Sequence, residues 1–348
     1  MGNHHPVLFE ATRGSLVESI HTGAIAIVDR FGNLVASTGD ADLVTYMRSS
    51  AKPFQALPLI ETGAVDQYHL TDEEIAIICA SHSGTEKHVE IVSALQHKTG
   101  IHEDQLLCGV HPPYHSPTFR KLLNEGIKIT ENYNNCSGKH TGMLLLARAM
   151  NVSPDNYIEP NHPIQQKILT SFAEMTGTEP KDVVIGIDGC SAPNYAVTLR
   201  EAAWGYAHLC DPIDLPPVRR DACRKIAHAM STQGMVIAGP ERFDTALLEI
   251  AGGKFLTKTG AEGYQCMGIM PDAIEAGSPG LGIAFKVMDG DTDNRARPVI
   301  ALEVLRQLGA ISAKELEILK NFDSRPIFNF RHLHIGDYQS AFKLTKWQ

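Results

Sequence analysis

Residues 24–37, AIAIVDRFGNLVAS, decide how we interpret the fold. Two short runs rich in Ile, Val and Ala flank Arg30-Phe31-Gly32, and this pattern predicts two strands joined by a tight turn. Strand-like patterns return in the last third of the chain, at Tyr264 to Met270 and Leu281 to Met288. We therefore expect a sheet that takes its strands from both ends of the chain.

The middle of the chain carries helical spacing of apolar residues instead. The predicted helices are Glu86 to Thr99, Pro117 to Asn124, Thr141 to Met150, Pro163 to Thr176 and Val218 to Thr232, with Pro298 to Gly309 after the turn Asp289-Gly290-Asp291. These elements predict an α+β fold with an antiparallel or mixed sheet built from both chain ends and an inserted helical region. We expect a single domain over residues 1–348 with two intimate lobes, a sheet lobe from about 1–45 and 253–348 and a helical lobe from about 46–252.

Composition excludes several classes of function. The chain has 31 Lys and Arg against 40 Asp and Glu, a net charge of −9, and no basic run that could neutralise nucleic-acid phosphates or bind an anionic membrane surface. No apolar run approaches the length of a membrane helix, and the start lacks the pattern of a secretory signal. Seven Cys, an odd number, favour reduced thiols and a cytoplasmic location.

The first candidate site is a Ser-Lys pair in Arg48-Ser49-Ser50-Ala51-Lys52. Ser49 and Lys52 are three residues apart, so a helix from about Ser50 to Thr62 would place both side chains on one face. A neutral lysine amine can then take the proton of the serine hydroxyl and make it a nucleophile. The alternative at this position is an N-cap serine followed by a surface lysine.

Two further stretches agree with this chemistry. Cys79 to Gly84 is a polar segment with Ser81 at its centre, although Ser83 could simply cap the next helix. Lys258-Thr259-Gly260 follows late in the chain, and a K-T-G strand edge recurs in Ser-Lys hydrolases. The order of these motifs, with helices between them, is that of a serine β-lactamase-like hydrolase.

Cysteines occur in two more polar runs, Asn134 to Gly142 and Ile185 to Pro193. Cys136 and Cys190 are candidate soft metal ligands, because each has oxygen or nitrogen donors beside it. They lack the C-x-x-C spacing of common zinc sites, so spacing alone does not establish a metal centre.

Taken together, these motifs resemble those of the rhizobial-type L-asparaginases over nearly the whole chain, from Val7 to about Asn294. The matching segments are Arg48 to Pro53, Cys79 to Gly84, Asn135 to His140, Asp188 to Cys190 and Lys258 to Gly263. The resemblance implies a fold similar to serine β-lactamases and to glutaminases of that fold, and a homodimer. The segment after about Phe322 does not align with the family pattern.

The resemblance also implies roles for individual residues. It makes Ser49 the nucleophile and Lys52 its base, with Ser81 and Lys258 as a second, facing Ser-Lys pair. It implies a zinc ion, completed by a water, on Cys136, Lys139 and Cys190. It places Asp188 close to that metal, and Arg48 and His140 near the bound amino acid.

The expected reaction is hydrolysis of L-asparagine to L-aspartate and ammonia through an acyl-enzyme on Ser49. For this, Lys52 must be neutral near pH 7, a drop of about 3 units from the unperturbed lysine pKa. Three alternatives stay open: a zinc amidohydrolase in which metal-bound water attacks, a penicillin-recognising enzyme of the same fold, and a non-catalytic protein that binds an amino acid or zinc.

Overall fold

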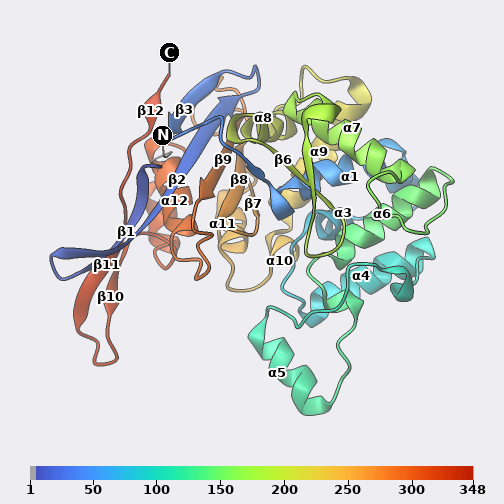
Figure 1. Ribbon diagram of the computed structural model, residues 1–348, viewed down its shortest axis with the longest axis horizontal. Coiled ribbons are helices and arrows are strands. Elements are labelled where there is room, and N and C mark those ends of the chain that lie inside the picture. Colours follow the sequence, from blue (N-terminus) through green and yellow to red (C-terminus); the bar gives the residue numbers. More distant parts are fainter. Residues whose placement is uncertain (1–4, 348) are drawn as a thin grey trace. The chain divides into compact units, whose positions relative to one another are not determined.

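The strand pair predicted at residues 24–37 forms part of an antiparallel sheet in the computed structural model, which describes residues 5–347 (Figure 1). Strand β2 (Leu16–Asp29) pairs with β3 (Leu34–Thr38) across the predicted turn. The predicted C-terminal strands are β8 (Tyr264–Ile269) and β9 (Leu281–Val287), and β9 pairs with β2. The prediction of a sheet built from both chain ends is therefore confirmed.

The sheet also contains strands that the sequence pattern did not identify. Its order runs β10-β11-β1-β2-β9-β8, and β3 pairs with both β2 and β12. The added strands are β1 (Val7–Arg13), β10 (Arg325–Phe328), β11 (His334–Ser340) and β12 (Thr345–Lys346). The tail after Phe322, for which the sequence indicated no role, thus supplies β11, which pairs with β1, and β10, which pairs with β11.

The core of this sheet lies where β2 and β9 meet. Residues Ala24–Val28 and most of β9 are buried, which explains their near-continuous apolar sequence. Helix α8 (Leu199–Cys210) packs on β2, β8 and β9. A Cβ atom at Gly282 would lie 1.7 Å from the backbone oxygen of Ala203, so only glycine permits this approach of helix to strand.

The chain divides into two compact units, each described here by itself. Unit 1 comprises residues 1–47, 197–211 and 259–348, and unit 2 comprises residues 48–196 and 212–258. These boundaries differ from the expected lobes chiefly at α8, whose residues fall within the range expected for the helical lobe. The apolar face of α8 packs against the sheet, so it belongs to unit 1. The other elements of unit 1 are β4 (Val44–Tyr46), α12 (Arg297–Gln307) and α13 (Ala313–Ile318).

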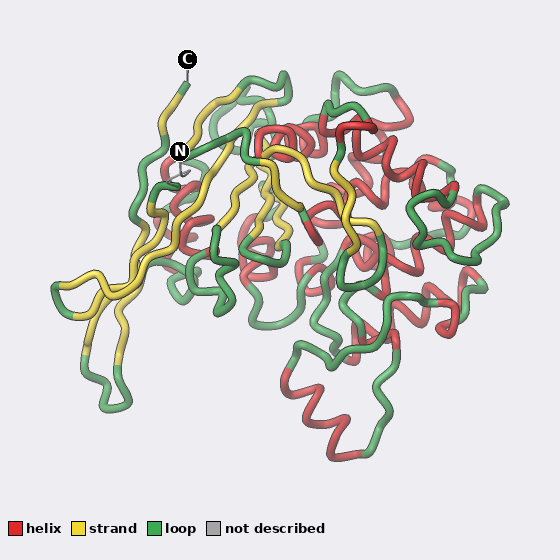
Figure 2. Tube along the Cα trace, viewed as in Figure 1, coloured by secondary structure: helices red, strands yellow, loops and turns green. Residues whose placement is uncertain are grey.

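Unit 2 is mainly helical (Figure 2). Its longer helices are α1 (Lys52–Glu61), α3 (Asp72–Cys79), α4 (Glu86–Thr99), α5 (Ser116–Glu125), α6 (Ser137–Ala149), α7 (Pro163–Thr176), α9 (Pro217–Thr232) and α11 (Phe243–Ala251). Shorter elements are α2 (Ala64–Gln67), α10 (Gly234–Ile237) and four 3₁₀ turns, Arg48–Ala51, Glu103–Gln105, Glu131–Tyr133 and Pro180–Asp182.

The predicted helix ends need two corrections. The helix expected from Thr141 begins at Ser137, because the polar run before it is already helical and buried. The helix expected from Ser50 to Thr62 is a 3₁₀ turn at Arg48–Ala51 followed by α1, with Pro53 in its first turn.

Strands also contribute residues to unit 2. Strand β5 (Val184–Ile187) pairs in an antiparallel hairpin with β6 (Pro193–Thr198), and the predicted Asp-Gly-Cys turn joins them. Strand β7 (Phe255–Thr259) carries Lys258. Within residues 5–347, no helix combines the length and the apolar character that a bilayer span requires.

Candidate active site

Every site residue predicted from the sequence lies in unit 2, and the centre of the site is the hydroxyl of Ser81. Its Oγ lies 2.9 Å from Lys52 Nζ and 2.9 Å from Lys258 Nζ. Lys52 is the first residue of α1, Ser81 follows α3, and Lys258 is in β7. Three segments distant in sequence therefore bring two buried lysines onto one serine hydroxyl.

The two lysines differ in their surroundings. Lys52 Nζ also donates to the backbone oxygens of Ala80 and of Asn135, the latter at 3.2 Å. The three protons of an ammonium at Lys52 are thus all accepted by oxygen atoms. Burial, and next the charge of Lys52, lower the pKa of Lys258 to about 7. Lys258 is therefore the lysine of this pair that readily becomes a neutral amine.

Ser49 occupies the 3₁₀ turn just before α1. It is partly exposed, and its hydroxyl makes no hydrogen bond within the described part of the chain. The expected contact with Lys52 is therefore not formed, because Lys52 is directed to Ser81 and the two backbone oxygens. Ser49 is near Lys52 in sequence, but the structure shows no bond between its hydroxyl and the amine of Lys52 or Lys258.

Cys136, Lys139 and Cys190, which the family resemblance implies as zinc ligands, lie close together in the structure. Lys139 Nζ lies 2.9 Å from Cys190 Sγ, and the two thiols share a hydrogen bond. That bond, with Lys52 and Lys139 nearby, holds the pKa of Cys136 well below its usual value despite burial. Burial alone would lower the pKa of Lys139, but the charges of Cys190 and Cys136 raise it. The cluster thus favours a thiolate beside an ammonium.

Asp188 and Arg48 form an ion pair at the edge of this cluster. Arg48 Nη2 lies 2.7 Å and Nε 2.9 Å from the same oxygen of Asp188. Burial tends to raise the pKa of Asp188, but Lys139 and Arg48 overcome it and the pKa is lowered. Both side chains are partly exposed, so the Asp188 carboxylate and the Arg48 guanidinium can each bind the oppositely charged group of a zwitterion.

His140 is fully buried beside the cysteines. Its Nδ1 lies 2.6 Å from the hydroxyl of Tyr157, which also accepts the backbone N–H of Leu107 at 2.9 Å. Burial lowers the pKa of His140 to about 4, so its ring is neutral at physiological pH. Because Nδ1 interacts with Tyr157, the other ring nitrogen, Nε2, is the one that can interact with Cys190.

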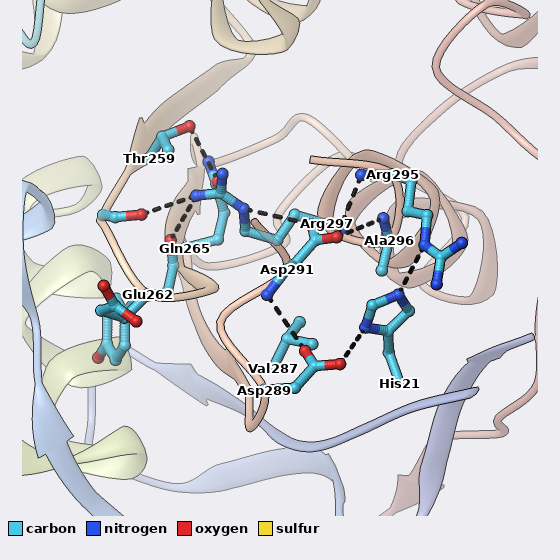
Figure 3. Close-up of polar contacts among 12 residues, drawn as sticks. His21, Thr259, Glu262, Gln265, Val287, Asp289, Asp291, Arg295, Ala296 and Arg297 are labelled. Carbon is cyan, nitrogen blue, oxygen red and sulfur yellow. Dashed lines mark hydrogen bonds and ion pairs between the residues drawn. The ribbon is translucent and has the colours of Figure 1, made fainter. Parts of the chain in front are cut away.

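The turn that follows Lys258 is held by a polar cluster of unit 1 (Figure 3). Asp291 accepts the backbone N–H groups of Ala296 and Arg297 and so caps α12. The side chain of Arg297 lies 3.5 Å from Asp291 and donates to the backbone oxygen of Gly260 at 2.7 Å. Thr259 bonds to Gln265 across the turn at 3.1 Å. Thr259 and Gly260 of the K-T-G segment are therefore held by the buried side chains of Gln265 and Arg297.

The sequence analysis missed several residues of the site. Asn135, Tyr157 and Asn194 contact predicted site residues through a backbone oxygen, a hydroxyl and an amide oxygen. Asn135 lies inside a recognised motif, so its neighbourhood could have been anticipated. Tyr157 and Asn194 lie in no motif, and no local signal marks them.

A family model described as L-asparaginase II matches residues 9–340. The chain belongs to the L-asparaginase II family. The match covers most of β1 and all of β10 and β11, and it ends before β12. Most of the segment after Phe322, which did not align with the family pattern by its sequence, is therefore part of the family domain. Membership identifies the protein as an amidohydrolase.

Solved structures that show some similarity to this chain include glutaminases. A probable glutaminase from Bacillus subtilis in complex with 6-diazo-5-oxo-L-norleucine is 16% identical over 82% of this L-asparaginase II chain and 83% of the other, with a TM-score of 0.41. A covalent complex of a Bacillus subtilis glutaminase with 5-oxo-L-norleucine is 14% identical over 89% and 92% of the two chains, also with a TM-score of 0.41. A search of curated protein sequences finds no significant match.

Proposed function

We propose that this member of the L-asparaginase II family hydrolyses L-asparagine to L-aspartate and ammonia through a covalent Ser49 intermediate. One observation carries the proposal: the Ser81 hydroxyl lies between two buried lysines, 2.9 Å from each amine. Two amines in contact with one hydroxyl suit the movement of a proton between them.

The pair supplies the base. When Lys258 is neutral, the proton of Lys52 can move through the Ser81 hydroxyl to Lys258, which leaves Lys52 neutral. The Ser49 Oγ–H then loses its proton to Lys52 as Oγ forms a bond to the side-chain carbonyl carbon of the substrate. When the C–N bond breaks, Lys52 returns that proton to the departing nitrogen, which leaves as ammonia. Water then cleaves the Ser49 ester by the reverse route and releases aspartate.

The proposed substrate site uses Arg48, Asp188 and His140. The Arg48 guanidinium would bind the α-carboxylate and the Asp188 carboxylate the α-ammonium group, because each already holds an opposite charge at 2.7–2.9 Å. A neutral His140 would add a hydrogen bond without a further charge. This set recognises an amino acid by its backbone groups and leaves the side-chain amide for Ser49.

We also propose zinc on Cys136, Lys139 and Cys190. Within residues 5–347 no three His, Cys, Asp or Glu side chains form a metal site, so a set of three donors requires the Lys139 amine. The residues fit zinc, because two thiols and one amine lie in contact and the pKa of Cys136 is held well below its usual value. When bound, zinc would displace the proton of Lys139 and add positive charge that orders the pocket. No proton transfer in the proposed mechanism passes through it.

Ammonia release from L-asparagine and from L-glutamine tests the function. We expect the wild type to act on asparagine, Ser49→Ala to lose at least about 1,000-fold in kcat, and Ser81→Ala to lose about 100-fold because proton sharing fails. A wild type treated with a chelator should keep Ser49-dependent turnover. If Ser49→Ala stays active and chelation abolishes activity, metal-bound water is the nucleophile. Binding of asparagine without ammonia release would indicate a non-catalytic protein.

The homodimer and the cytoplasmic location also remain proposals. All seven cysteines are buried thiols that form no disulfide in residues 5–347, which suits a reducing compartment. Sedimentation equilibrium of the purified chain, whose mass is 38.0 kDa, distinguishes a monomer from a dimer.

A further inference from the structure

The residue before the proposed nucleophile has an unusual backbone conformation. Arg48 has a φ of +52°, in the left-handed region that residues with a Cβ rarely adopt. Such a conformation costs energy of its own and persists only where neighbouring groups hold it. The position of Ser49 therefore depends on what holds Arg48.

Two hydrogen bonds fix the turn on either side of Ser49. The backbone N–H of Arg48 donates to Asn194 Oδ1 at 3.1 Å, and the hydroxyl of Ser50 donates to the backbone oxygen of Lys258 at 2.6 Å. Asn194 is 6% exposed and Ser50 is fully buried, so water does not replace either bond. Both neighbours of Ser49 are anchored, while the Ser49 hydroxyl stays free within the described residues.

The anchors of Arg48 come from one hairpin. Asn194 lies in β6, and Asp188, which binds the Arg48 guanidinium, directly follows β5. The side chain of Arg48 is thus held from the turn of this hairpin and its backbone from β6. A shift of this hairpin would move Ser49 and the proposed substrate site together.

We propose that Asn194 is a positioning residue for Ser49: its amide oxygen holds Arg48 in the left-handed conformation and so directs the Ser49 hydroxyl at the substrate. This inference rests on the proposed role of Ser49 as nucleophile. Asn194 belongs to none of the motifs that identify the family, and it acts through the backbone of Arg48 rather than on the substrate. Its loss should therefore affect the chemical step more than substrate binding.

Three variants separate positioning from stability. Asn194→Ala removes the acceptor, and Asn194→Asp keeps an acceptor oxygen in the same place. Thr176→Ala is the matched control, because the buried Thr176 hydroxyl donates to the backbone oxygen of Phe172 at 3.0 Å and to the Thr178 hydroxyl at 3.2 Å, and neither partner belongs to the turn around Ser49. Thermal denaturation of each variant shows how far the lost bond destabilises the fold.

Steady-state kinetics with L-asparagine gives the first test. We expect Asn194→Ala to lower kcat by about 30- to 100-fold with KM within about threefold, since a displacement near 1 Å is enough for such a loss. Asn194→Asp should recover most of kcat, and Thr176→Ala should keep the wild-type kcat at a similar loss of thermal stability. If Asn194→Ala and Thr176→Ala have equal kcat, or if the loss lies in KM alone, Asn194 does not position Ser49.

Covalent labelling gives a test that does not depend on turnover. A diazo ketone analogue of asparagine should label Ser49 of the wild type, as intact-protein mass and peptide mapping would show. Asn194→Ala should lower the labelling rate at saturation without changing the half-saturating concentration. Unchanged labelling of Asn194→Ala overturns the positioning role alone. Undiminished turnover by Ser49→Ala instead overturns the proposed function on which it rests.

Discussion

At the scale of single residues, the site depends on two lysines whose charge states are coupled. Lys52 has three oxygen acceptors, while Lys258 is desolvated and repelled by Lys52. The sequence predicted that both lysines belong to the site and that one of them is neutral near pH 7. It assigned the neutral amine to Lys52, whereas the lowered pKa in the structure is that of Lys258. Spacing places side chains, but only the tertiary surroundings determine which amine loses its proton.

A pH dependence follows from Lys258. Its pKa is lowered to about 7 in the folded protein, below the value of about 10.4 in the unfolded chain. The charge at Lys258 therefore opposes folding fully below about pH 7, and this penalty disappears as the pH rises through about 10.4. We expect Lys258→Met to be more stable than the wild type near pH 7, with the difference closing towards about pH 10. Urea denaturation at several pH values measures it.

The same group should set the acid limit of activity. Once Lys258 is protonated below about pH 7, it cannot receive the proton of Lys52, so kcat/KM of the wild type should fall there. Wild-type kcat/KM that stays constant down to about pH 5 would contradict this assignment. A Lys258→Met variant without any stability gain near pH 7 would contradict the lowered pKa itself.

At the scale of elements, the site depends on how closely α6 packs against α3. Gly138 and Gly142 lie one helical turn apart on α6 and face α3. A Cβ at Gly138 would lie 2.2 Å from the backbone oxygen of Ile77, and one at Gly142 would lie 2.7 Å from a side-chain carbon of Ile78. This contact positions the helix that carries Lys139 and His140.

Substitution of these glycines should give a defined order of effects. Gly138→Ala should lower the free energy of unfolding by about 1–3 kcal/mol or more, because a backbone oxygen cannot move without its helix. Gly142→Ala should cost less, since the Cβ would meet side-chain atoms of Ile78, which can shift more easily than the backbone of a helix. Urea denaturation of both variants checks the order, and equal or reversed losses would show that α3 and α6 separate easily.

At the scale of the whole molecule, strands from the two chain ends pair with each other in the sheet of unit 1. Strand β11 pairs with β1, where Ala11 stands opposite Tyr338 and Phe9 opposite Ser340. Leu8 and Phe9 are fully buried. The final strands therefore cover the edge of β1, which would otherwise expose unpaired backbone groups and apolar side chains.

Truncation tests this dependence on the chain end. A chain that ends at Phe322 lacks β10, β11 and β12, so we expect it to aggregate or to melt several degrees below the full chain. A chain that ends at Lys343 loses only β12, a strand of two residues, and should stay close to the full chain in solubility and melting temperature. Light scattering and thermal melts compare the two. Equal behaviour would mean that β11 contributes little to the sheet.

The sequence by itself determined the class of fold, the strands at 24–37, 264–270 and 281–288, and the residues that gather in unit 2. Those features follow from local periodicity and from short motifs, which are encoded within a few neighbouring residues. Only the tertiary structure decided that Ser81 receives both lysines, that Lys258 carries the lowered pKa, and that Asn194 holds the turn before Ser49. Burial and contacts between distant segments set those properties, and no local pattern in the chain expresses them.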